Sequence, residues 1–140
     1  MDKNKQMKKA PKVISWTAAI IAAIIMLQTL YFKFIGAPES VFIFSQLNLE
    51  PYGRILIGIG EMVASVLIVI PKSRIYGSLL GIGLMSGAVF FHLTKLGIEV
   101  MNDGGYLFLL CLIVLIGCSV CLFIERKELK TFTKGIFTSK

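Results

Sequence analysis

Long apolar runs separated by short polar segments dominate this chain. Four such runs extend over residues 13–32, 54–70, 76–93 and 106–124. Each is close to the roughly 20 residues that an α-helix needs to cross a hydrocarbon core about 30 Å thick. None of the runs alternates polar and apolar residues as the strands of a membrane barrel do. The pattern therefore predicts an all-α membrane protein, a bundle of four transmembrane helices.

The segment between the first two runs, "GAPESVFIFSQLNLEPYG", predicts an additional short helix. Pro38 and Glu39 suit the first turn of a helix, and apolar residues such as Phe42 and Phe44 follow them. The segment is too short to cross a bilayer. We expect a short interfacial or re-entrant helix on the outer side of the membrane, covering the bundle.

The composition is that of a membrane protein, and the apolar runs leave no room for a soluble domain. Hydrophobic residues make up 56% of the chain and charged residues only 16%, whereas soluble domains are about one quarter charged. We therefore expect one transmembrane domain over residues 13–124, with a basic segment before it (1–12) and a basic tail after it (125–140). The lipid bilayer is the first partner that this composition implies.

The distribution of basic residues predicts an orientation. Twelve of the fifteen Lys and Arg residues fall on one side of the predicted spans: Lys3, Lys5, Lys8, Lys9, Lys12, Lys72, Arg74, Arg126, Lys127, Lys130, Lys134 and Lys140. By the positive-inside rule, both termini are expected in the cytoplasm and the protein in the inner (plasma) membrane. The net charge of +7 is thus interpreted as a topology signal and not as a nucleic-acid-binding surface.

Small residues within the runs predict where helices pack closely. They are Ala18, Ala19, Ala22 and Ala23 in the first run, Gly58 and Gly60 in the second, and Gly77, Gly81, Gly83 and Gly87 in the third. Because small residues let two backbones approach, we expect these positions to lie at contacts between helices.

Glu61 is the polar residue that the apolar pattern does not explain. It lies seven residues after Arg54, so the two share a helix face, with Glu61 about 10 Å deeper in the membrane. Lys33 and His92 end the first and third runs at the outer level of Arg54, and Asp103 lies in the outer loop. These five residues are candidates for a ligand-binding or proton-handling pocket in the outer half of the bundle.

A purely structural role for Glu61 is the alternative interpretation. An ionisable side chain inside a membrane tends to face the bundle interior and to find a partner. A protonated Glu61 hydrogen-bonded to Ser65, or to a polar group of another helix, would satisfy that requirement without any ligand.

Metal and thiol chemistry receive little support from the sequence. The chain has a single histidine and no pair of donors at ligand spacing, so we predict no metal site. Cys118 and Cys121 have the C-x-x-C spacing of redox dithiols, but they lie near the end of an apolar span and not at a helix N-terminus. We interpret these two cysteines, and Cys111, as packing residues.

The stretch from Lys33 to Gly105, beginning "KFIGAPESVFIFSQLNLEPYGRILIGIGEM", resembles the DoxX family of small four-helix membrane proteins. The resemblance rests on Arg54, Gly58 and Glu61 in the second run, on Met85, Gly87 and Ala88 in the third, and on the His92–Leu93 pair that closes it. It implies a four-helix fold. It also implies an association with quinone-linked redox reactions or with quinone and thiol stress.

Two functions of different classes follow. In the first, the protein is a redox-associated accessory subunit that holds a quinone-like or other small lipophilic ligand, with Glu61 and His92 exchanging protons and Arg54 fixing the ligand or Glu61. It would need no bound cofactor, and it is expected to serve a membrane or soluble redox partner more than to be a self-sufficient enzyme. The second is a small proton-coupled carrier, which the lack of an internal repeat disfavours. A purely structural subunit and a homo-oligomer also stay open.

Overall fold

The computed structural model describes the backbone of residues 3–137 and the side chains of residues 9–127 and 130. Its helices are α1 (Lys3–Ile35), α2 (Pro38–Gln46), α3 (Tyr52–Val69), α4 (Arg74–Phe91) and α5 (Tyr106–Phe137), with a π-helical turn η1 (His92–Leu96) after α4. The described backbone contains helices and connecting turns but no strand. The predicted all-α fold is confirmed.

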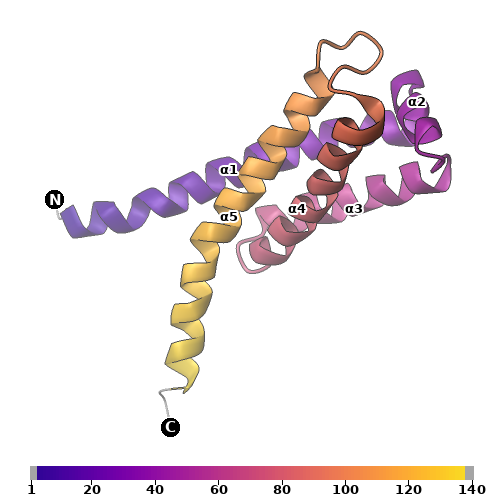
Figure 1. Cartoon of the computed structure of the whole chain (residues 1–140). Coiled ribbons are helices and arrows are strands. Elements are labelled where there is room, and N and C mark those ends of the chain that lie inside the picture. Colours follow the sequence, from indigo (N-terminus) through magenta and orange to yellow (C-terminus); the bar gives the residue numbers. More distant parts are fainter. Residues whose placement is uncertain (1–2, 138–140) are drawn as a thin grey trace.

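Four of the helices are long and apolar enough to cross a membrane. The candidate spans are Lys9–Ile35, Tyr52–Val69, Arg74–Leu96 and Tyr106–Lys127, and they match the four apolar runs of the sequence. The start of α1 and the end of α5 lie at the end of the bundle that is away from α2 and the loop before α5 (Figure 1). The helices α1 and α5 continue beyond their spans into the basic segments at that end.

The four spans form a ring in which each helix packs against two neighbours. The pairs are α1 with α3, α3 with α4, α4 with α5, and α5 with α1. The core consists of Ala19, Ala22, Ala23, Met26, Ala64, Ile68, Met85, Val114, Cys118 and Cys121, and all of these except Ile68 and Val114 have small or unbranched side chains. Such residues allow the close helix contacts that hold membrane bundles together, because lipid tails are as apolar as the core itself.

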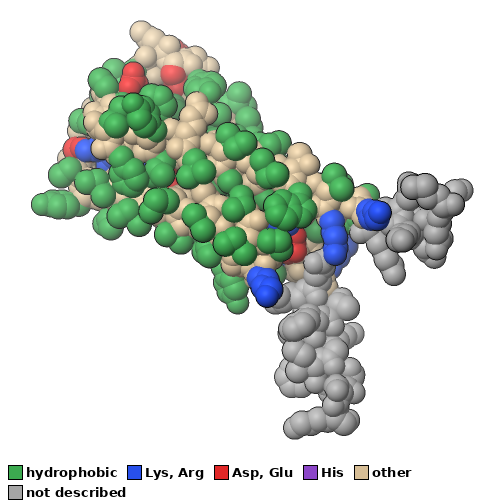
Figure 2. All heavy atoms as spheres, turned by 180° about the vertical axis from the view of Figure 1, so that it is seen from behind, with side chains coloured by type: hydrophobic (Ala, Val, Ile, Leu, Met, Phe, Trp, Pro, Cys, Tyr) green, Lys and Arg blue, Asp and Glu red, His purple; other side chains and the backbone are tan. Residues whose placement is uncertain are grey.

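Burial is inverted relative to a soluble protein. Large apolar side chains such as Leu56, Ile24 and Ile116 are exposed. In Figure 2 hydrophobic side chains are spread over the face shown, while charged side chains gather toward its two ends. By contrast, Arg54, Glu61, Arg74 and His92 are buried. Surfaces of this kind fit a hydrocarbon solvent, so the bundle is that of a membrane protein. The side chains of Lys3, Lys5, Lys8, Lys134 and Lys140 lie outside the described residues.

The glycines divide into two groups, which corrects the expectation that all of them pack within the bundle. A Cβ atom added at Gly77 would lie 2.4 Å from the backbone nitrogen of Ile68, and one at Gly81 would lie 2.6 Å from Cys118 Sγ. No atom lies within 4 Å of the corresponding position at Gly83 or Gly87. These two face away from the rest of the chain, because they lie on the outer side of α4.

The predicted short helix between the first two spans is α2. Proline occupies the start of this helix, where its missing N–H is no loss. Ser40 and Phe44 are buried, and Phe42 is exposed. Because α2 contacts α1, α3 and η1, it covers the end of the bundle that is opposite the termini (Figure 1).

Candidate functional site: a buried ion pair between α1 and α3

Glu61 forms an ion pair with Lys33 of the neighbouring helix. Lys33 Nζ lies 2.9 Å from Glu61 Oε2, and the two side chains are 14% and 4% exposed. Thr29, one turn before Lys33 on α1, donates its hydroxyl to the same carboxylate oxygen at 3.3 Å. The hydroxyl of Thr29 also lies 3.0 Å from the backbone carbonyl of Met26, so its single proton is shared between two acceptors. Glu61 is thus held by α1, not by its own helix.

This geometry decides between the two structural partners proposed for Glu61. Ser65 donates its hydroxyl to the backbone carbonyl of Glu61 at 2.7 Å, which is the ordinary bond of a serine one turn further along a helix. The carboxylate itself is bound by polar groups of another helix. The Lys33 side chain reaches it because both residues lie on the facing sides of α1 and α3.

Arg54 does not contact Glu61, although the two lie on one face of α3. Its guanidinium pairs instead with Glu50, through Nε at 2.8 and 2.9 Å and Nη2 at 2.7 Å. Its Nη1 donates to the backbone carbonyl of Lys33. The expectation that Arg54 fixes Glu61 directly is therefore wrong, since a two-turn separation leaves each side chain to find a nearer partner.

Arg54 nevertheless belongs to the same site through Lys33. The carbonyl of Lys33 lies in the last turn of α1, where backbone acceptors have no intrahelical donor. This carbonyl accepts the N–H of Gly36 at 3.4 Å as well as Arg54 Nη1. The buried guanidinium thus helps to fix the end of α1, where Lys33 reaches Glu61. Gly36 lies beside this contact and suits the site through its positive φ of 67°, since a Cβ atom there would be in ordinary contact with the guanidinium nitrogens at 3.7 Å.

His92 and Asp103 form a second polar group at the turn between α4 and α5. The buried His92 ring places Nδ1 2.8 Å from the carbonyl of Gly97, and it packs edge-on against Phe108 with ring centroids 5.5 Å apart. Within the described residues, no hydrogen bond or ion pair joins this group to the Lys33–Glu61 pair. The single five-residue pocket expected from the sequence is thus two polar groups, each held by its own local contacts.

Asp103 organises the loop before α5. Its carboxylate accepts the backbone N–H groups of Val100, Gly105 and Leu107, each at 2.9 Å. Burial raises the pKa of Asp103, but these three donors and the nearby His92 outweigh that effect and lower its pKa below the usual value. The carboxylate is therefore ionised at neutral pH and acts as a cap for the first turn of α5.

A third polar cluster, which the sequence analysis did not identify, lies at the opposite end of the bundle. Arg74 of α4 pairs with Glu125 of α5 at 3.1 Å, and Ser15 of α1 lies between them. The sequence gives little indication of this cluster, because a basic residue that flanks an apolar run is expected to lie in solvent. Arg74 and Glu125 both belong to segments that read as ordinary basic flanks.

The cysteines occupy the positions that the packing interpretation expects. Cys118 and Cys121 are fully buried in the core between α1, α4 and α5, and Cys111 is partly buried. Among the described residues, no group of three or more His, Cys, Asp or Glu side chains is arranged to hold a metal ion.

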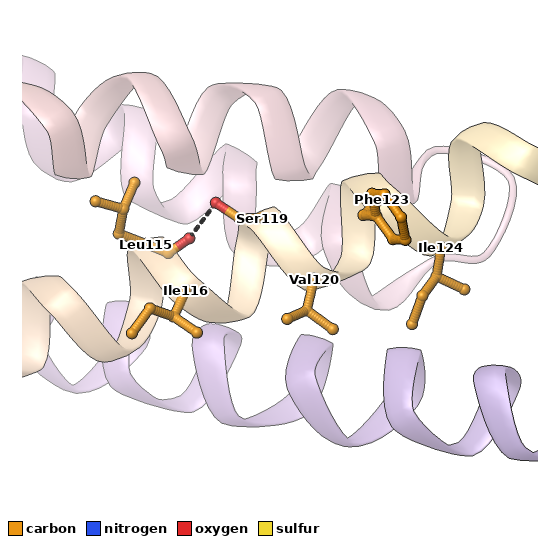
Figure 3. Close-up of a pocket in the computed structure, with 6 residues that line it drawn as sticks. All are labelled: Leu115, Ile116, Ser119, Val120, Phe123 and Ile124. Carbon is orange, nitrogen blue, oxygen red and sulfur yellow. Dashed lines mark hydrogen bonds between the residues drawn. The ribbon is translucent and has the colours of Figure 1, made fainter.

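An apolar groove runs along α5, and its lining includes no residue of the three polar clusters. It is lined by Leu115, Ile116, Ser119, Val120, Phe123 and Ile124 (Figure 3). Its single polar side chain, Ser119, donates to the carbonyl of Leu115 at 2.7 Å. Because all six lining residues come from one helix and the hydroxyl is already bonded, the groove suits a lipid acyl chain more than a polar ligand.

Comparison with known proteins adds no family to this geometry. No protein-family model, curated protein or solved structure matches the chain. The resemblance to the DoxX family stays a prediction that rests on the residues quoted for it. Of these, Arg54, Gly58 and Glu61 all lie buried on the inner side of α3, and His92 is buried at the end of α4.

Proposed function

We propose that this chain is a DoxX-like protein of the inner membrane, a redox-associated accessory subunit whose outer-half site takes a quinone-like or other small lipophilic ligand. The observation that carries the proposal is the buried Lys33–Glu61 ion pair. It joins two candidate membrane spans, with Lys33 Nζ 2.9 Å from Glu61 Oε2. Twelve of fifteen cations on the side of the termini support cytoplasmic termini, and with that orientation the pair would lie toward the outer face.

A buried ion pair between two spans favours a functional role over a purely structural one. Moving two charges out of water costs several kcal/mol per ion, and apolar residues of similar size commonly serve stability equally well. The core of the bundle is otherwise apolar and already includes small residues such as Ala22, Ala23 and Ala64. An ionisable residue within a span is therefore a candidate for binding or proton transfer.

The chemistry of the pair fits a ligand with carbonyl oxygens. The Lys33 ammonium has three N–H donors, and the Glu61 carboxylate takes one of them. A quinone oxygen can accept another. Because Lys33 is the more exposed partner, the ligand would meet it first, with Glu61 beneath as the group that gives or takes a proton.

The other candidate residues have supporting roles in this proposal. Arg54 positions Lys33 by binding its carbonyl, and Glu50 holds the guanidinium in place. His92 and Asp103 shape the turn that leads into α5. We therefore assign ligand contact to Lys33 and Glu61, and positioning to Arg54, His92 and Asp103.

The test is to identify what co-purifies with the protein in a mild detergent. Lipid-soluble compounds from wild type, Glu61→Gln and Lys33→Met are measured by mass spectrometry, with Ser65→Ala as the matched control on the same helix. We expect a quinone-like compound with wild type and Ser65→Ala, and about tenfold less with the other two variants, since each would lose at least one charge-assisted hydrogen bond. Equal amounts in all four proteins would contradict the proposal.

A second readout separates binding from folding. Glu61→Gln keeps the shape and an acceptor oxygen but cannot titrate. We expect it to fold, with some loss of thermal stability because Lys33 loses its charged partner, and yet to fail in complementing a deletion strain under quinone stress. Full complementation by Glu61→Gln and Lys33→Met would leave the pair a structural element.

A further inference from the structure

All four spans meet at the side chain of Arg74. Its Nε donates to the carbonyl of Ile68 on α3 at 2.9 Å, and its Nη1 lies 3.2 Å from Ser15 Oγ on α1 and 3.1 Å from Glu125 Oε1 on α5. The guanidinium also lies over the ring of Trp16, 4.3 Å from its centroid. With 2% exposure, Arg74 is buried and not the solvated flank that its place in the sequence indicates.

Each contact of Arg74 satisfies a group that would otherwise be costly. The carbonyl of Ile68 lies in the last turn of α3, where it has no intrahelical donor. Glu125 Oε1 accepts from both Arg74 and Ser15, the latter at 2.6 Å. We call Ser15, Arg74 and Glu125 the basic-end cluster.

The basic-end cluster lies directly over a thiol. Cys121, one turn before Glu125 on α5, is fully buried and donates to the backbone carbonyl of Ser15 at 3.4 Å. Cys118 lies one turn deeper, against Gly81 of α4. Toward the basic segments α1 and α5 diverge from one another (Figure 1).

Two buried polar atoms at this end have no hydrogen-bond partner among the described residues, namely Arg74 Nη2 of the cluster and Ser78 Oγ. A buried polar group without a hydrogen bond costs on the order of 1–3 kcal/mol. Water entering this end would satisfy both atoms, which lowers the cost of opening it.

We propose that the basic-end cluster is a lock that keeps this end of the bundle closed, and that its release opens a water path to the Cys121 thiol. The lock is independent of the Lys33–Glu61 site, which joins α1 to α3 near the opposite end. It acts by holding α1, α4 and α5 together through one carboxylate. Opening is confined to the turn of α5 that holds Cys121 and Glu125, because the preceding turn, with Cys118, is packed tightly against Gly81.

The three native cysteines report such opening at three depths. The full chain is placed in lipid nanodiscs and treated with a water-soluble maleimide, and the modification rate of each thiol is followed by peptide mass spectrometry. The variants are Glu125→Ala, the milder Glu125→Gln and Ser15→Ala. Arg126→Gln is the matched control, since it removes the charge of an exposed neighbour on the same helix turn.

We expect Glu125→Ala to raise the rate at Cys121 by about tenfold or more, because Arg74 loses its carboxylate. Ser15→Ala and Glu125→Gln should raise it by smaller factors, while Cys118, Cys111 and the Arg126→Gln control stay at wild-type rates. An unchanged Cys121 rate in all three cluster variants would overturn the lock. An equal rise at all three thiols would also overturn it, since that result indicates general unfolding.

Discussion

The ammonium of Lys33 lies 2.9 Å from the carboxylate of Glu61 and ties the end of α1 to the middle of α3. Removing one partner leaves the other charge unpaired in the bundle, whereas removing both leaves two apolar surfaces. We expect Lys33→Met to lower the free energy of unfolding by about 2–3 kcal/mol, and Lys33→Met/Glu61→Leu to recover most of it. Unfolding in mixed detergent micelles measures both. A double variant that is less stable than Lys33→Met would contradict the coupling.

Gly77 and Gly83 allow a sharp test of the packing between α3 and α4. A methyl group at Gly77 meets the backbone of Ile68, which cannot move aside, while the space at Gly83 is open. Gly77→Ala is expected to destabilise the bundle by about 1–3 kcal/mol. Gly83→Ala should be neutral or stabilising by up to about 1 kcal/mol, because alanine is the better helix former. Thermal unfolding of the two variants in one detergent decides the point.

Asp103 predicts a pH dependence of the loop before α5. Its pKa is lower in the folded protein than in the unfolded chain, so its contribution to stability is fully present above the unfolded value of about 3.9. That contribution is lost as the pH falls through the folded pKa. At pH 7, the backbone amides of this loop should be better protected from hydrogen exchange in wild type than in Asp103→Asn.

The difference in loop protection should shrink steadily once the pH falls below about 4. Hydrogen exchange at the amides of Val100, Gly105 and Leu107 measures it, because these are the groups that the carboxylate binds. A difference that does not change between pH 7 and pH 3 would show that the charge of Asp103 has no part in the cap.

The buried cysteines are expected to be replaceable. Cys118 and Cys121 fill core space between α1, α4 and α5, and alanine at both positions removes only two small groups. We predict that Cys118→Ala/Cys121→Ala folds and functions normally, with about 1–2 kcal/mol of lost stability. Growth of a complemented deletion strain under quinone and thiol stress is the measurement. Loss of protection in this variant alone would indicate a working dithiol.

Topology can be tested with reporters. Fusions at Met1, in the turn between α3 and α4, and at Lys140 should all report the cytoplasm, since four spans return the chain to its starting side. An insertion in the loop before α5 should report the outside. An external signal at Lys140 with an internal one at Met1 would exclude an even number of spans.

The sequence was sufficient for the architecture. Each of the four apolar runs is about long enough to cross a bilayer as an α-helix. Within hydrocarbon, a helix satisfies every backbone N–H and C=O group internally, so the number and order of the spans follow from the runs. The start of α2 could also be predicted, because Pro38 is compatible with the first turn of a helix and not with its interior. Burial of Glu61 inside the bundle could be predicted as well, because hydrocarbon is a poor solvent for a carboxylate.

The tertiary structure decided which polar groups meet. Glu61 is bound by Lys33 and Thr29 of α1 and not by Arg54 of its own helix, and Arg74, which the sequence presents as a basic flank, is the point where four helices converge. Sequence spacing fixes neighbours within one helix because the helical repeat is constant. Contacts between helices depend on the rotation and depth of each helix. These are set by how the small residues of all four spans pack together.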